Sequence, residues 1–185
     1  MTEQAWIEAA VRRAGQEGWT SATLRHALED CGEGAELLSS AFPRGVTGAI
    51  ASWLAQVDAQ MDAAAAAEDL ATLRTPERIR RVVEIRLRLL EPDRDALRAA
   101  LGHLALPWNA PVALRCLART ASAMWHAAGD RSADFSWYTR RATLAVVYAA
   151  TLAFWMRPNQ PEMAEVLSFL DRRLQDLPKP RAKAA

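Results

Sequence analysis

The sequence predicts an all-α protein with one buried core. Of its 185 residues, 39 are Ala and 21 are Arg against only two Lys, and Ala and Arg favour helices. Apolar residues recur at helical spacing along most of the chain, and no segment shows the alternation of a β-strand. Hydrophobic residues make up 51% of the sequence, which suffices for a single domain of this length. We therefore expect a bundle of about nine helices.

Three short helices are expected at the N-terminus. Gly18 and Gly32 follow the first two helices, as is typical of helix ends. Thr20 or Ser21 can cap the second helix through a side-chain oxygen. The three helices form a helix-turn-helix-like head over residues 1–45. Their expected spans are 2–16, 21–30 and 33–41.

Three further helices are expected in the middle of the chain. Thr47 can cap a long fourth helix that runs into the five alanines at 63–67. The fifth begins with Thr-Pro-Glu at 75–77, because Thr can cap, Pro suits the first helical position and Glu faces the positive end of the helix dipole. Its Glu and Arg side chains at i,i+4 spacing are interpreted as a solvated face. The fifth and sixth helices are expected over 75–90 and 93–104.

The C-terminal half is expected to hold three more helices. Pro107 and Pro111 flank a segment that we expect to be a loop. The seventh helix follows over 112–127, the eighth begins near Ser132 or Asp134 and runs to Arg157, and the ninth begins at Pro161. Residues 46–177 thus form a C-terminal helical bundle, and residues 178–185 form a basic tail with too few apolar residues to pack. The apolar stripe of the ninth helix consists of Met163, Val166, Leu167, Leu170, Leu174 and Leu177.

Several classes of function are disfavoured by what the sequence lacks. The net charge of +1 gives no overall field that would attract nucleic acid or an anionic membrane. Cys31 and Cys116 are far apart, without neighbours at metal-ligand spacing, so we expect two free thiols and no metal site. There is no phosphate-binding glycine loop, nucleophile elbow or E-x-x-H pair. We therefore expect no catalytic residues, no cofactor of its own and no enzymatic activity.

The location of the protein is expected to be cytoplasmic. The first residues include Glu3 and Glu8 and lack the apolar core of a signal peptide. The longest uncharged stretch spans 142–156, and its length of fifteen residues is below the roughly 20 that cross a bilayer. We interpret this stretch as a buried helix.

Aromatic residues gather in the second half of the chain and form a candidate pocket. Three of the seven Trp and both Tyr fall between positions 125 and 155. On the eighth helix the large residues share one face, beside many Ala that leave volume for rings or for a ligand. A ligand pocket and a core anchored by Trp and Tyr are both compatible with this pattern. The face carries Trp137, Leu144, Tyr148, Thr151 and Trp155.

The segment 134–141 places an acid, three aromatic residues and two Arg at the start of the eighth helix. Arg140 and Arg141 near a helix N-terminus oppose the helix dipole, so they need a carboxylate such as Asp130 or Asp134, or a binding partner. Trp, Tyr and Arg are enriched at protein–protein hot spots. An internal ion pair and a partner-binding surface both remain open.

The run from Met124 to Ala142, with its continuation to Tyr148 and Thr151, has a distinctive pattern. In this run the sequence resembles the Coq-nine family of ubiquinone-biosynthesis accessory proteins, and the resemblance covers most of the chain. Further matching segments are Gly18-Trp19, Phe42-Pro43-Arg44-Gly45, residues 74–80, Arg86-Leu87-Arg88, residues 106–111 and residues 169–173.

The resemblance implies a TetR-like all-α fold with a degenerate helix-turn-helix head that has turned from DNA to lipid. It implies a homodimer whose C-terminal bundle binds an isoprenoid quinone precursor or other lipid and assists the di-iron demethoxyubiquinone hydroxylase. The hydroxylase-facing patch of the family maps onto Met124, Asp134, Trp137, Tyr138 and Arg141. For the lipid pocket we select Trp125, Leu144, Tyr148, Thr151 and Trp155.

The C-terminus departs from the family pattern. Eukaryotic members carry a long amphipathic helix that docks on the membrane, whereas this chain ends eight residues after Leu177. Peripheral contact with the inner membrane would then depend on the weak attraction of Lys179, Arg181 and Lys183. A bacterial member of the family is the easier interpretation.

Two alternatives remain. The head has the helix count of a TetR-type ligand-responsive transcriptional regulator, but the formal charge between His26 and Pro43 is −4, which disfavours binding to DNA. The other alternative is a purely structural adaptor that binds the hydroxylase through the aromatic patch and carries no lipid.

Overall fold

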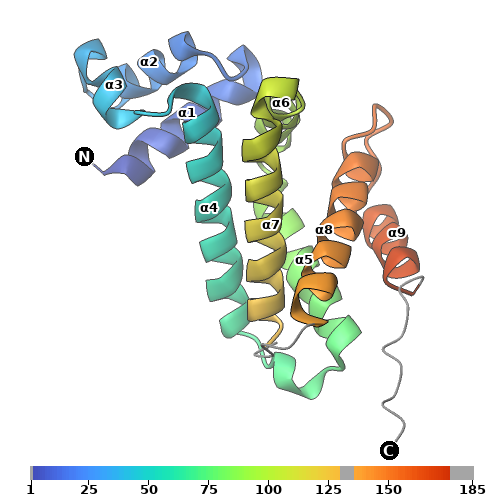
Figure 1. Cartoon of the computed structure of the whole chain (residues 1–185). Helices are drawn as coiled ribbons and strands as arrows, with labels where there is room; N and C mark the ends of the chain where they lie inside the picture. The colour runs from blue at the N-terminus through green and yellow to red at the C-terminus, as the bar shows by residue number, and fades with distance from the viewer. Residues whose placement is uncertain (1, 130–135, 176–185) are drawn as a thin grey trace, which may run out of the picture.

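The computed structural model describes residues 2–129 and 136–175, and within these residues every regular element is helical (Figure 1). The predicted all-α class is therefore confirmed, and the described part holds nine α-helices. Three single 3-10 turns connect them, namely η1 (Ala35–Leu37), η2 (Leu70–Thr72) and η3 (Pro107–Asn109). The α-helices are α1 (Glu3–Glu17), α2 (Ser21–Asp30), α3 (Leu38–Ala41), α4 (Gly45–Ala66), α5 (Thr75–Leu90), α6 (Arg94–Leu104), α7 (Ala110–Ala127), α8 (Ser136–Trp155) and α9 (Met163–Gln175).

The head, α1 to α3, lies across one end of α4 and packs on α6 (Figure 1). The indole N–H of Trp19 donates to the carbonyl of Ala96 in α6 at 2.9 Å, and the Trp19 ring lies 5.7 Å from that of Trp53 in α4. The buried residues of the head and of the bundle belong to one continuous hydrophobic cluster. The head is thus fixed to the bundle by core packing as well as by the chain itself.

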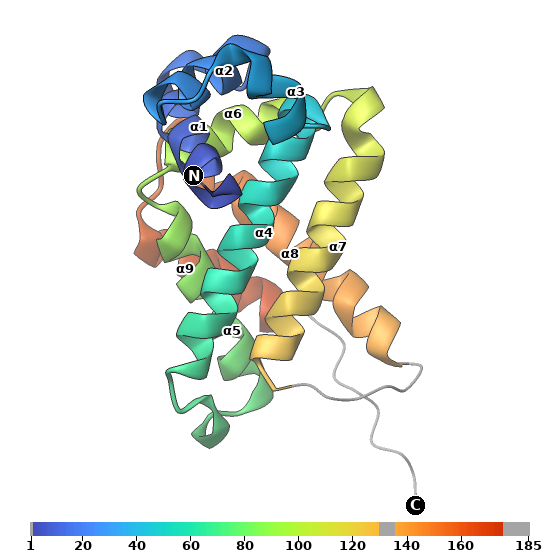
Figure 2. The same ribbon diagram turned by 90° about the vertical axis from the view of Figure 1, so that its left-hand side faces the viewer.

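The bundle is arranged around α7. Figure 1 shows α4, α7, α8 and α9 in sequence from one side of the molecule to the other, and each contacts the next. The view in Figure 2 shows α8 behind α4 and α7, so the inner face of α8 meets the centre of the bundle. α5 closes this centre from the remaining side through contacts with α4, α7 and α9.

Two of the expected helix caps, Thr47 and Thr75, are wrong. α4 begins at Gly45, where the φ angle of +55° favours glycine, so Thr47 lies inside the helix. The Thr47 hydroxyl instead contacts His103 Nε2 at 3.0 Å. At the start of α5 the capping group is the Glu77 carboxylate, which accepts from the backbone N–H of Arg74 at 2.9 Å. The Thr20 cap of α2 is confirmed by the Thr23 N–H donating to its hydroxyl.

The segment between the two prolines is more ordered than expected. Residues 107–109 form η3, and Pro111 lies in the first turn of α7, where a missing backbone N–H costs nothing. α8 is described from Ser136, so its expected start near Ser132 or Asp134 lies outside the described residues, as does the basic tail. In the described part of the chain no helix is both long and apolar enough to cross a membrane.

Candidate functional site

Four of the five residues selected for the lipid pocket lie together on the inner face of α8. Leu144, Tyr148, Thr151 and Trp155 are at most 2% exposed and belong to the bundle core. Trp155 is also covered by the Arg94 guanidinium, which stacks on its ring. The structure therefore brings these four side chains together as predicted, and it places them in a packed interior.

Trp125 stands apart from these four residues, on α7. It is half-buried, and its indole N–H donates to the carbonyl of Arg140 at 3.1 Å. This contact fixes the end of α7 against the beginning of α8. Trp125 thus lies between the residues selected for the lipid pocket and the beginning of α8, where the hydroxylase-facing patch is predicted, and not among the four buried residues of α8.

A buried ionic network meets the α8 face at the centre of the bundle. The guanidinium of Arg86 in α5 donates to the hydroxyl of Tyr148 and to Asp58 Oδ1 in α4, the latter at 2.9 Å. Thr120 in α7 donates to the same carboxylate at 3.0 Å, and Arg119 reaches its other oxygen at 3.1 Å. Side chains from α4, α5, α7 and α8 therefore meet at the Asp58 carboxylate and the Arg86 guanidinium.

The pKa values of Arg86 and Tyr148 are shifted by burial and by the groups around them. Arg86 is 2% exposed, and burial acts to lower its pKa. The charge of Asp58 and the hydrogen bonds to Asp58 and Tyr148 outweigh burial, so the pKa of Arg86 lies above its ordinary value. Burial raises the pKa of the Tyr148 phenol, because the phenolate would lie in a region without solvent. The network thus holds a guanidinium cation beside a neutral phenol.

The sequence interpretation missed Asp58 and Arg86. The Glu and Arg pairs of α5 predict a solvated face opposite its apolar residues, whereas Arg86 follows Val82 by four residues and precedes Leu90 by four, on the buried stripe. Asp58 likewise lies on the buried stripe of α4, four residues after Leu54. A charged residue at the spacing of an apolar stripe is the signal that could have identified both.

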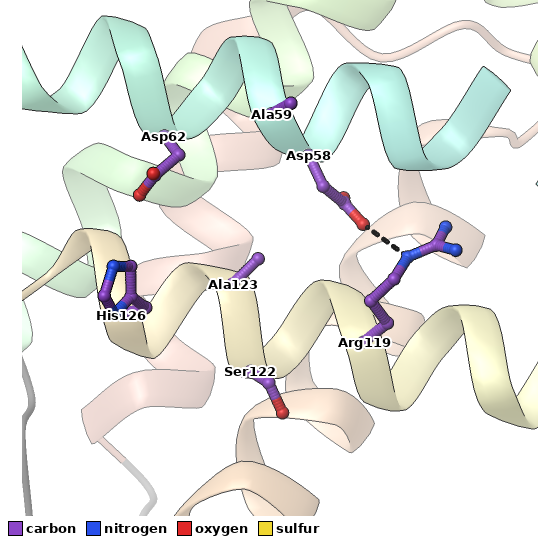
Figure 3. Close-up of a pocket in the computed structure, with 7 residues that line it drawn as sticks. All are labelled: Asp58, Ala59, Asp62, Arg119, Ser122, Ala123 and His126. Carbon is purple, nitrogen blue, oxygen red and sulfur yellow. Dashed lines mark hydrogen bonds and ion pairs between the residues drawn. The ribbon is translucent and has the colours of Figure 1, made fainter. Parts of the chain in front are cut away.

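A surface hollow adjoins this network in the groove between α4 and α7. Its volume is about 400 Å³, and the Asp58–Arg119 pair lies at one end (Figure 3). Figure 3 shows Asp62 and His126 facing each other at the other end. A second hollow, of about 290 Å³, lies in the head and is lined by Trp6, Phe42 and Arg44 among others. Neither hollow is lined by the α8 residues selected for the lipid pocket. Within the described residues, no group of three or more His, Cys, Asp or Glu side chains is placed to hold a metal ion.

The residues assigned to the hydroxylase-facing patch differ in their surroundings. Tyr138 in the first turn of α8 is 73% exposed and Arg141 is half-buried, whereas Met124 in α7 is fully buried. A surface formed by one copy of the chain therefore presents Tyr138 and not Met124. Asp134 lies outside the described residues, and Trp137 lies in α8 with a side chain that is not described.

Comparison with known proteins connects this chain to a family. The family model COQ9 matches residues 110–179. The rat protein "Ubiquinone biosynthesis protein COQ9, mitochondrial" is 33% identical over 177 residues, which cover 92% of this chain and 56% of that protein. The human protein of the same name is 42% identical over 103 residues, covering 56% of this chain and 32% of the human one. This chain is similar to the COQ9 proteins. The resemblance identified from the sequence is confirmed. The matched part of this chain spans 56% of the rat protein and 32% of the human one.

A solved structure shows that the COQ9-like chain has the TetR fold. The TetR transcriptional regulator from Nitrosomonas europaea matches with a TM-score of 0.74 over 94% of this chain and 95% of the regulator. Its sequence identity is 22%, so the likeness shows the fold alone. The predicted TetR-like fold is confirmed, and the regulator alternative is not favoured. The COQ9 relatives are named mitochondrial, and the expected bacterial cytoplasm stays a prediction.

Proposed function

We propose that this chain is a lipid-binding accessory protein of ubiquinone biosynthesis. In this role it presents an isoprenoid quinone precursor to the di-iron demethoxyubiquinone hydroxylase and catalyses no reaction itself. The observation that carries the proposal is the match to the rat ubiquinone biosynthesis protein over 92% of this chain. The TetR-like fold is consistent with a bundle that encloses a small molecule.

The inner face of α8 supplies the binding surface in this proposal. An isoprenoid tail needs an apolar environment, and Leu144 and Trp155 provide it. Tyr148 and Arg86 are polar groups at the same depth, suited to hydrogen bonds with the ring oxygens of a quinone. Because these side chains are packed together, the lipid enters only when they change rotamer or when α8 moves away from α5.

The exposed first turn of α8 supplies the surface for the hydroxylase. Tyr138 offers a large amphipathic ring at 73% exposure, and such rings are frequent anchors of interfaces. The Trp125–Arg140 contact joins this turn to α7, next to the lipid-binding face. A hydroxylase bound at Tyr138 would therefore receive the quinone ring from a neighbouring part of the same helix.

A homodimer is part of the same proposal. Val146 on the outer face of α8 is 69% exposed, and Ala142 and Ala153 on that face are exposed as well. An apolar stripe of this kind is typical of a surface that a second copy covers. Sedimentation velocity of the purified chain distinguishes a dimer from a monomer.

The proposal is tested by measuring lipid and partner binding on the same protein. An organic extract of the purified chain, examined by mass spectrometry, should contain quinone precursor or other lipid in stoichiometric amount. An extract without lipid, from protein that binds the hydroxylase, would support the structural adaptor instead.

The partner surface is tested by Tyr138→Ala. This variant should weaken binding to the hydroxylase by about tenfold or more, as expected for an aromatic hot spot, and leave the lipid content unchanged. Trp108→Ala is the matched control, since it removes an aromatic ring that is exposed to the same fraction and lies in η3, outside α8. Equal loss of binding in both variants, or an unfolded Tyr138→Ala, would refute the assignment of the patch.

A further inference from the structure

A second exposed aromatic residue lies far from α8, in the turn between α6 and α7. Trp108 in η3 is 73% exposed, and Leu114 in the second turn of α7 is 66% exposed. Pro107, Ala110 and Pro111 beside them are exposed too. From Leu104 to Leu114 the sequence contains no charged residue. This end of α7 therefore presents an uncharged stretch, residues 104–114, with one large exposed ring, which we call the Trp108 turn.

The Trp108 turn is held in place by buried polar contacts. The side-chain N–H of Asn109 donates to the carbonyl of His103 at 2.8 Å, and Asn109 is almost fully buried. The Thr47 hydroxyl bonds to the ring of His103 at 3.0 Å and thereby ties the turn to the start of α4. An ordered backbone that displays a tryptophan to solvent is pre-organised for contact, because little conformational entropy remains to be lost on binding.

Two exposed arginines accompany this surface. Arg115 directly follows Leu114 in α7, and Arg44 is the residue before α4, whose Thr47 hydroxyl contacts His103 and Asn109 beside the turn. Among the described residues neither arginine forms an ion pair or a side-chain hydrogen bond, and both are exposed. Glu3 shares the head hollow with Arg44 but is not paired with it. The edge of the Trp108 turn is therefore positively charged.

We propose that the Trp108 turn anchors the chain on the surface of an anionic lipid bilayer. Tryptophan is the residue most suited to the boundary between headgroups and acyl chains, where its ring is apolar and its N–H remains hydrated. Leu114 adds apolar area, and Arg44 and Arg115 meet anionic headgroups. A protein surface is the less favoured partner, because the exposed Trp108 ring can enter the apolar layer of a bilayer while the exposed arginines beside it contact the anionic headgroups. The anchor goes beyond the proposed function, since it requires neither bound cargo nor the hydroxylase.

The test is co-flotation of the full chain with vesicles of phosphatidylcholine alone or with phosphatidylglycerol added. The wild-type chain should bind the anionic vesicles, and less so at high salt. Trp108→Ala should lower the partition coefficient about tenfold through loss of buried apolar area. Arg115→Gln should lower it about fivefold on anionic vesicles and leave neutral vesicles unaffected.

Tyr138→Ala is the matched control, because Tyr138 is exposed to the same fraction as Trp108 and lies on a different element. It should bind vesicles as the wild type does. Absence of wild-type binding, unchanged binding of Trp108→Ala, or equal loss in Tyr138→Ala would overturn the proposal. A changed sedimentation coefficient of Trp108→Ala without vesicles would also overturn it, since the ring would then belong to a protein interface. None of these outcomes depends on the lipid content that tests the proposed function.

Discussion

At the scale of single residues, the hydrogen bond from Arg86 to Tyr148 connects α5 to α8 in the interior of the bundle. A buried guanidinium is stable only when its donors are satisfied, and here Tyr148, Asp58 and Thr120 accept from it. A buried ion pair adds little net stability compared with apolar residues of the same shape, but removing one partner is costly. The network therefore acts chiefly to fix how α4, α5, α7 and α8 meet.

Tyr148→Phe should destabilise the chain by about 1–3 kcal/mol, because the Arg86 guanidinium loses one acceptor while the ring keeps its packing. Urea unfolding followed by circular dichroism measures the change. Ser168→Ala is the control, since it removes an exposed hydroxyl that bonds to a carbonyl of its own helix, and its effect should stay within about 0.5 kcal/mol. Equal stability of the Tyr148→Phe variant and the wild type would show that the network is dispensable.

At the scale of elements, α9 shows how a helix is attached by one stripe. The predicted stripe is confirmed for the described positions, with Val166, Leu167 and Leu170 buried and Met163 and Leu174 partly buried. Phe169 extends the contact by stacking on Phe154 of α8 with ring centroids 4.6 Å apart. An ion pair between Asp171 and Arg80 at 2.8 Å joins α9 to α5. Side-chain packing therefore holds α9 against both neighbours.

Leu170→Ala should lower the free energy of unfolding by about 2–5 kcal/mol, because Leu170 is fully buried and its removal leaves a cavity between α9 and the bundle. Ser168→Ala is the control on the same helix, since Ser168 is exposed and bonds only to the carbonyl of Ala164. Urea unfolding of both variants measures the difference. Similar stability of the two variants would mean that α9 adds little to the fold.

At the scale of the whole molecule, charged pairs join consecutive elements and neighbouring turns of α5. Arg13 in α1 bonds to Asp30 at the end of α2, and this hydrogen bond lowers the pKa of Asp30. Arg81 in α5 bonds to Glu68, which follows α4, and lowers the pKa of Glu68 in the same way. For Glu84, burial acts to raise the pKa, but hydrogen bonds from Arg88 and Arg81 outweigh it, and the pKa is lowered.

These lowered pKa values predict a loss of stability in acid. Carboxylates with a lowered pKa stabilise the folded state above their unfolded values, and this contribution disappears as the pH falls through the folded values. The free energy of unfolding should therefore decline between about pH 5 and pH 3. Arg81→Gln should flatten this decline, because Arg81 serves both Glu68 and Glu84.

Arg74→Gln is the control for this acid profile, since Arg74 is exposed and its hydrogen bonds to Glu77 and Arg78 use its backbone N–H and carbonyl. It should keep the decline of the wild type. Urea unfolding at a series of pH values measures all three proteins. A wild-type profile that is flat below pH 5 would contradict the role of these pairs.

The sequence by itself determined the helical class, most helix boundaries, the Thr20 cap and the shared face of Leu144, Tyr148, Thr151 and Trp155. Each of these follows from residues a few positions apart, where periodicity and capping act. Only the tertiary structure decided that Asp58 and Arg86 meet in the interior, since they are 28 positions apart. It likewise assigned the Thr47 hydroxyl to His103, 56 positions away, and buried Met124 while exposing Trp108. Such contacts depend on how helices pack, and the pattern along one helix does not specify which side chain of another helix it will meet.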